Sequence, residues 1–371
     1  MRLITLAIHT YDRAVAVRML LEAEGIPVTL QNVNLEQPEV SSGVRVRIPE
    51  HDLPLALRIV ENPDIFSGAV ANACTPTSHR TILVPTDFSE YSLNAARAAI
   101  RLAAARKADL AFIHAYIDPR MSGSVQLSDN LTYDVAETEA TEHLIAAANG
   151  QMAKFAESLR AMMKSGELPM ARFSTDVVEG VPEEAIINSA KEKAPYLVVM
   201  GTRAAERKEK DLIGSVTAEV LDDCRFSVLT VPEVVRPDDC QSPRSILFFS
   251  NLDQEDIIAM DTLYRYFPES HSNVTIVHVP LRNRFTDRTA GRSALALSEY
   301  CRKTFSHFTF KSVPVTPKNA VQELEKLQSE HSYDLIVVPN RRRNALVRMF
   351  SPTLAHRILF QADVPMLVIP V

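Results

Sequence analysis

The most restrictive feature of the sequence is a long internal repeat that alternates apolar segments with helix-like ones. The segment TILVPTD at 81–87 recurs as SILFFSN at 245–251, and His114 recurs as His278, both 164 positions later. Further along, the separation falls to 138 positions, so the second copy lacks 26 residues in its middle. Parallel sheets with right-handed helical crossovers accommodate such an alternation. We therefore predict an α/β protein with two tandem, doubly wound, parallel-sheet domains.

The chain of 371 residues has room for a further domain ahead of the repeat. Its first part shows a strand, a helix, two strands and a helix in order, which predicts a small α+β ferredoxin-like domain. The piece GIPV at 25–28 resembles part of a small bacterial domain assigned to signal transduction. We therefore expect four segments. They are a signalling domain at 1–66, a linker at 67–79, a nucleotide-binding domain at 80–233 and a degenerate copy of it at 244–371.

The stretch from 198 to 221 predicts a phosphate-binding loop. An apolar strand ends at Gly201, a charged loop follows, and Gly214 and Ser215 open a helix. Glycine lets backbone amides approach an anion closely, and the free N–H groups of a helix start complement its charge. Only ten residues of the chain are glycine, which makes two in this stretch informative. Taken alone, the stretch is equally typical of a strand, a turn and a helix with two turn glycines.

A carboxylate stands at the end of the first strand of the repeat. Asp87 follows the apolar run at 81–85, and Ser89 is placed to cap the helix that comes next. The carboxyl end of a parallel strand faces the crevice where open α/β sheets bind ligands. A carboxylate there can accept hydrogen bonds from ribose hydroxyls, although aspartate is also a common turn residue. Together with the glycine loop, Asp87 predicts a nucleotide site.

These motifs resemble the ATP-binding branch of the universal stress protein family over about residues 80–233. The family's loop reads glycine, two residues, glycine, nine residues, glycine, then serine or threonine. This chain keeps that spacing with Ala204 in place of the middle glycine. If the position needs φ > 0, the alanine costs roughly 1 kcal/mol.

The resemblance implies a Rossmann-like fold and ATP as the ligand, with Mg²⁺ as an optional companion. It assigns Asp87 to the ribose and Arg203 to a charge on the loop. The implied site comprises Pro85, Thr86, Asp87 and Ala115 around the adenosine, Met200, Gly201, Arg203 and Ala204 along the loop, and Gly214, Ser215, Val216 and Thr217 at the phosphates.

The second copy lacks the residues that this chemistry needs. Its counterparts of Asp87, Gly201, Gly214 and Ser215 are Asn251, Pro339, Pro352 and Thr353. Proline has no N–H to offer a phosphate, and its φ is fixed near −65°. We therefore expect no nucleotide in the second domain. An arginine-rich loop at 341–348 remains, which is typical of a solvated surface and, as an alternative, of an anion site.

Composition restricts the partners and the compartment. The net charge of −6 gives no reason to expect a nucleic-acid surface. The apolar runs are strand-sized and no apolar leader is recognised, so we expect neither a membrane span nor a signal peptide. The four cysteines are scattered without metal-ligand spacing, which is typical of reduced thiols in the cytoplasm. We expect a cytoplasmic protein with an adenine nucleotide as its small-molecule partner and no metal site.

Three functional classes fit these patterns. The leading one is a stress-response and signal-transduction protein that binds ATP without a catalytic residue. The second is a weak ATP hydrolase, although no pair of general base and nucleophile is recognisable and His114 is better interpreted as a strand residue. The third is an interaction module with vestigial nucleotide sites. The resemblance also implies that the last strands of the two copies, at 228–231 and 367–369, pair within one chain, with a further homodimer left open.

Overall fold

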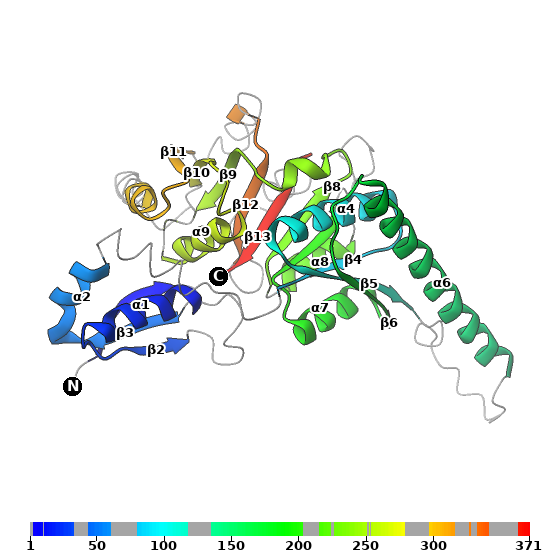
Figure 1. Cartoon of the computed structure of the whole chain (residues 1–371), viewed down its shortest axis with the longest axis horizontal. Helices are drawn as coiled ribbons and strands as arrows, with labels where there is room; N and C mark the ends of the chain where they lie inside the picture. Colours follow the sequence, from blue (N-terminus) through cyan, green and yellow to red (C-terminus); the bar gives the residue numbers. More distant parts are fainter. Residues whose placement is uncertain are drawn as a thin grey trace. The chain divides into compact units, whose positions relative to one another are not determined.

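The computed structural model divides the chain into two compact units (Figure 1). It describes residues 3–9, 11–32, 44–60, 80–117, 135–202, 215–223, 226–250, 252, 254–278, 297–315, 326–327, 332–340 and 363–371. Unit 1 comprises Met1–His79, Arg225–Ser227 and Ser242–Val371, and unit 2 comprises Arg80–Cys224 and Val228–Gln241. Unit 2 thus holds the first copy of the repeat. Within these ranges, no helix combines the length and the apolar character needed to cross a lipid bilayer.

Unit 2 is built on the parallel sheet that the repeat predicts. Its described strands are β4 (Thr81–Pro85), β5 (Asp109–Tyr116), β6 (Phe173–Glu179), β7 (Leu197–Thr202) and β8 (Val228–Pro232). They lie in the order β8-β7-β4-β5-β6. On the central strand β4, Ile82, Leu83 and Val84 are all at most 1% exposed. A strand that is apolar on both faces is expected where helices cover both sides of a parallel sheet.

Four described helices cover this sheet. They are α4 (Glu90–Arg106), α6 (Val135–Ser165), α7 (Pro182–Lys193) and α8 (Ser215–Asp223). Right-handed crossovers place α4 and α6 on one face and α7 and α8 on the other, and α7 and α8 contact each other. Ala95, Ala99 and Ala103, at four-residue spacing on α4, are fully buried. These small side chains let α4 lie close to the strands beneath it.

Asn94 on α4 ties this helix to the chain that leaves β8. Its Nδ2 donates to the backbone oxygens of Pro232 at 3.1 Å and Val235 at 2.8 Å. Nearby, Arg101 pairs with Asp238 at 2.5 Å in the short helix η2 (Pro237–Cys240). Asn94 therefore bonds the backbone carbonyl groups at the end of β8, of which the Pro232 oxygen also accepts from the Val235 N–H at 3.1 Å.

We expect the substitution Asn94→Ala to lower the free energy of unfolding of unit 2 by about 1–2 kcal/mol, because the hydrogen bonds from the Asn94 side chain to these carbonyls are lost. Urea unfolding followed by circular dichroism measures the change. Asn149→Ala is the matched control, since the exposed side chain of Asn149 donates along its own helix, to Ile145 O at 2.9 Å. Alanine there should be neutral or stabilising. Equal losses of stability in the two variants would contradict the role of Asn94.

The second copy, in unit 1, repeats this architecture. Its described strands are β9 (Ser245–Ser250), β10 (Asn273–His278), β11 (Thr309–Pro314), β12 (Leu335–Asn340) and β13 (Met366–Pro370). They lie parallel in the order β11-β10-β9-β12-β13. Helix α9 (Gln254–Tyr266) follows β9 as α4 follows β4. The prediction of two doubly wound parallel-sheet domains is confirmed.

The N-terminal part of unit 1 has the predicted order of elements. They are β1 (Leu3–His9), α1 (Tyr11–Ala23), β2 (Thr29–Asn32), β3 (Val44–Pro49), the short helix η1 (Glu50–Asp52) and α2 (Leu53–Val60). The strands form an antiparallel sheet in the order β1-β3-β2. On β3, Val44, Val46 and Ile48 are fully buried, and the alternation of a strand places Arg45 and Arg47 on the opposite face. A small α+β domain is therefore confirmed, and its signalling role stays a prediction.

Two cysteines lie within the described residues, and both are free and buried. Cys240 ends η2 in unit 2, and Cys301 belongs to unit 1. Burial, together with the charges of Asp239 and Asp238, raises the pKa of the Cys240 thiol to about 12. Because the thiolate is the reactive form, Cys240 is inert in the folded protein.

Candidate functional site

The predicted site lies where the strand order of unit 2 reverses. From β4 the chain runs outward to β5 and β6, and it returns to β7 and β8 on the other side of β4. Ligands of open α/β sheets bind at such a switch point, outside the carboxyl ends of the strands. Asp87 follows the end of β4, and Gly201 is near the end of β7, which pairs with β4. The two residues that carry the prediction thus lie at neighbouring strand ends.

A tight turn after β4 presents Asp87. The Thr86 backbone N–H donates to Ile113 O on β5 at 2.8 Å. The Thr86 hydroxyl lies 3.1 Å from Ser92 Oγ on α4 and accepts from the Phe88 N–H at 3.1 Å. Only 6% of Thr86 is exposed. Its side chain therefore shapes the turn, and the next residue, Asp87, faces solvent.

Phe88 holds the turn in an unusual backbone conformation. Its φ is 65°, a left-handed value that costs roughly 1–2 kcal/mol for a residue with a side chain. The ring packs on His114 and Phe155, with centroid distances of 4.4 and 5.7 Å, and this packing offsets the strain. His114 Nδ1 also lies 2.8 Å from Thr86 O. His114 therefore braces the turn, as expected for a strand residue with a structural role.

The Asp87 carboxylate is exposed but already accepts hydrogen bonds from the helix that follows it. Oδ1 accepts from Ser89 N at 3.1 Å and from Ser89 Oγ at 2.5 Å. Oδ2 accepts from the Tyr91 hydroxyl at 2.5 Å. Partial burial would raise the pKa of Asp87, but these hydrogen bonds outweigh it and hold the pKa below its ordinary value of 3.8. Asp87 is therefore ionised at neutral pH and can accept further hydrogen bonds from hydroxyl groups.

Gly201 packs directly against the backbone of α4. A Cβ at this position would lie 2.6 Å from the Tyr91 carbonyl carbon and 2.9 Å from the Ser92 nitrogen. Side chains do not tolerate approaches below 3.0 Å to backbone atoms that cannot move away. Only glycine permits this close contact between a strand and a helix start. Gly201 thus holds the amino end of α4 beside β7.

The remaining predicted residues on strands differ in their exposure. Pro85 ends β4, and Ala115 lies on β5 opposite Val178; both are partly exposed. Met200 on β7 is 4% exposed and belongs to the core. Among these residues, Pro85 and Ala115 have side-chain surface to offer a ligand beside Asp87.

The predicted phosphate loop is described only at its two ends. Beyond β7, the chain is described again from Ser215, the first residue of α8. Val216 is partly exposed, and Thr217 is 5% exposed. Arg203, Ala204 and Gly214 lie outside the described residues.

Sequence reasoning missed the contact between Tyr91 and Asp87. Tyr91 stands in the first turn of α4, and Asp87 lies two residues before the cap Ser89, outside the helix. Helical spacing therefore does not predict this contact; the turn at Phe88 brings the two side chains together.

The second copy keeps the turn but changes its polar groups. Leu252 has φ 58°, close to the value for Phe88. His278 Nδ1 lies 2.9 Å from Ser250 O, which repeats the contact that His114 makes. The Ser250 hydroxyl donates to buried Asp256 at 2.7 Å. The turn is therefore conserved between the copies as a scaffold, with a different group at its centre.

The predicted replacements in the second copy are described in part. Pro339 lies on β12, is buried and stands opposite Ile369 of β13. It can offer no N–H to a phosphate. Asn251, Pro352, Thr353 and the arginine-rich loop at 341–348 lie outside the described residues.

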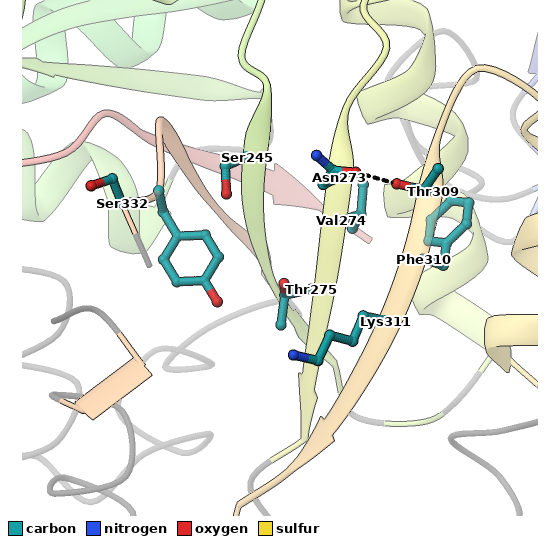
Figure 2. A pocket seen from close by; sticks show the side chains of 9 residues that line it. Ser245, Asn273, Val274, Thr275, Thr309, Phe310, Lys311 and Ser332 are labelled. Carbon is teal, nitrogen blue, oxygen red and sulfur yellow. Dashed lines mark hydrogen bonds between the residues drawn. The ribbon is translucent and has the colours of Figure 1, made fainter. Parts of the chain in front are cut away.

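A cavity of about 500 Å³ in unit 1 lies away from this kind of site. Figure 2 shows it at the amino ends of β9, β10 and β11, where Ser245, Asn273 and Thr309 begin the strands. Thr309 donates to Asn273 Oδ1 at 2.5 Å across its rim. Because ligands of parallel sheets bind at the carboxyl ends, this cavity is not the second copy's equivalent of the Asp87 site.

Comparison with known proteins finds similarity over both copies. The universal stress protein family matches residues 78–232 and 273–370, more than half of the chain. A universal stress protein of Methanocaldococcus jannaschii is 30% identical over 154 residues, which are 41% of this chain and 82% of that protein. A solved universal stress protein from Archaeoglobus fulgidus covers 78% of this chain and 98% of its own, with 17% identity and a TM-score of 0.49. A universal stress protein solved in complex with cAMP covers 42% of this chain and 98% of its own, with 25% identity and a TM-score of 0.29.

Proposed function

Because the chain belongs to the universal stress protein family, we propose that its first copy is a regulatory binding site for ATP. The observation that carries this proposal is the exposed, ionised carboxylate of Asp87 at the strand-order switch point, beside the end of β7. A charged acceptor is placed there to hold the ribose hydroxyls. The amino end of α8, which follows the loop, would supply backbone N–H groups to the phosphates.

The proposal gives the predicted residues distinct roles. Pro85 and Ala115 would line the adenosine, and the buried residues Thr86 and Met200 would contribute backbone only. Arg203 would provide a positive charge on the loop. The phosphate cradle would comprise Gly201, Ala204, Gly214, Ser215, Val216 and Thr217. Mg²⁺ would arrive with the nucleotide, because this ion is usually held by phosphates together with few protein groups.

Titration calorimetry with ATP and Mg²⁺ tests the proposal, with an expected stoichiometry near one site per chain. The second copy should add no site, because Pro339 has no amide hydrogen. Two equivalent sites would contradict the assignment to the first copy. No binding at all would favour the alternative, an interaction module with a vestigial site. Release of ADP during the titration would favour a weak hydrolase. Competition between cAMP and ATP tests whether the loop prefers a triphosphate.

We also propose that the two copies act together in the cytoplasm. The last strand of each copy is apolar and buried, β8 in one and β13 in the other, and an apolar edge strand left unpaired would invite association. Pairing of these strands within the chain would remove both edges. The buried free thiols of Cys240 and Cys301 suit a reducing compartment. Size-exclusion chromatography with light scattering distinguishes a monomer of this kind from a further homodimer.

A further inference from the structure

Tyr91 occupies a central position in the candidate site. It is the second residue of α4, and its hydroxyl donates to Asp87 Oδ2 at 2.5 Å. Its carbonyl group lies against Gly201, at the start of the predicted phosphate loop. One residue thus contacts both parts of the site that the proposed function assigns to the ligand.

The bond from Tyr91 to Asp87 uses the same chemistry as a ribose. A phenol and a sugar hydroxyl both donate an O–H to a carboxylate oxygen. Ser89 supplies two hydrogen bonds to Oδ1, and the Tyr91 hydroxyl donates to Oδ2. A ribose hydroxyl that approaches Asp87 therefore meets Tyr91 at that oxygen.

We propose that the Tyr91 hydroxyl is an internal competitor of the ribose for Asp87, and that it sets both the affinity and the sugar selectivity of the site. The inference rests on the proposed function. A sugar hydroxyl must displace the phenol to reach the Asp87 carboxylate, whereas a sugar without hydroxyls leaves the phenol hydrogen-bonded in place. When the ligand leaves, the phenol returns and the carboxylate keeps a donor.

The backbone around Tyr91 restricts how this exchange takes place. The main chain at Tyr91 and Ser92 is pressed against Gly201, and Ser89 caps the helix by accepting from Ser92 N at 3.3 Å. The start of α4 is therefore fixed. Displacement of the hydroxyl requires only rotation of the Tyr91 side chain, which is fast compared with backbone rearrangement.

The test compares Tyr91→Phe with the unmodified full chain, using ATP and 2′,3′-dideoxy-ATP as probes in titration calorimetry. Removing the hydroxyl should tighten ATP binding by about 10-fold, since a hydrogen bond to a charged group no longer has to be broken. The variant should discriminate ATP from the dideoxy nucleotide more strongly than the unmodified chain does. Tyr300→Phe is the control, because Tyr300 is exposed in unit 1, outside the proposed site; it should change neither affinity.

Urea unfolding of Tyr91→Phe shows whether the variant is folded, so that a loss of structure is not read as a loss of binding. Equal ATP affinities of the folded variant and the unmodified chain would overturn the inference and leave the proposed function intact. Weaker ATP binding by the folded variant would also overturn it, because Tyr91 would then be a direct ligand contact. Failure of both proteins to bind ATP would overturn the proposed function itself, and this inference with it.

Discussion

Substitution of Gly201 by alanine is expected to destabilise unit 2 by about 2–3 kcal/mol and to weaken ATP binding at the same time. The added Cβ would meet the Tyr91 carbonyl group and the Ser92 nitrogen, which are backbone atoms of a capped helix. They cannot rotate away as a side chain would, so α4 must shift or β7 must bend, and overpacking of this kind has that cost. Urea unfolding gives the stability, and calorimetry gives the affinity.

Gly150→Ala is the matched control. Gly150 is exposed in the middle of α6, and a Cβ there has nothing within 4 Å. Alanine is the better helix former, so this variant should gain about 0.5–1 kcal/mol. The two glycine-to-alanine changes thus have opposite expected signs. A stable Gly201→Ala protein with unchanged affinity would contradict the close contact between β7 and α4.

Asp87→Asn is expected to weaken ATP binding by about 10- to 100-fold, because an amide accepts ribose hydroxyls less strongly than a carboxylate does. Asparagine is also the residue that the second copy has at this position, Asn251. In the Asp87→Asn background, Tyr91→Phe should no longer tighten binding, since the two residues act through one hydrogen bond. Calorimetry on the two single variants and the double variant measures this coupling.

The control for loss of charge is Asp109→Asn. Asp109 pairs with Arg172 at 3.0 Å at the amino end of β5, at the opposite end of the sheet from the candidate site, and exposed ion pairs contribute little to stability.

The lowered pKa of Asp87 also determines how stability depends on pH. Because its pKa is lower in the folded chain, the stabilising effect is present above 3.8 and is lost as the pH falls further. ATP affinity should therefore not change through this group between about pH 5 and 9.

The sequence predicts those parts of the fold that depend on local patterns. Apolar runs predict β4 and β7, and the prediction that Ser89 caps the following helix is confirmed, because its side chain accepts from Ser92 N. The repeat predicted a second sheet with the same connectivity. These features follow from periodicity and capping, which depend on residues that are close together in the sequence.

Contacts between distant segments could not be predicted in the same way. The sequence pattern explains Gly201 as a glycine at the start of a loop. The structure adds a second reason, because a side chain there would clash with α4, more than a hundred positions earlier in the chain. Asn94 was not singled out, because the carbonyl groups that it satisfies follow β8. Such roles depend on which elements the fold places side by side.

The reactivity of the two buried cysteines can be used to measure local opening of the protein. Cys240 is 5% exposed and protonated, so an alkylating reagent reaches it only when the segment around η2 detaches. Cys301, with no exposed surface, has the same property in unit 1. With Cys74 and Cys224 changed to serine, the labelling rates of these thiols would measure the opening of each unit separately. A nucleotide bound to unit 2 should then slow the labelling of Cys240 and leave that of Cys301 unchanged.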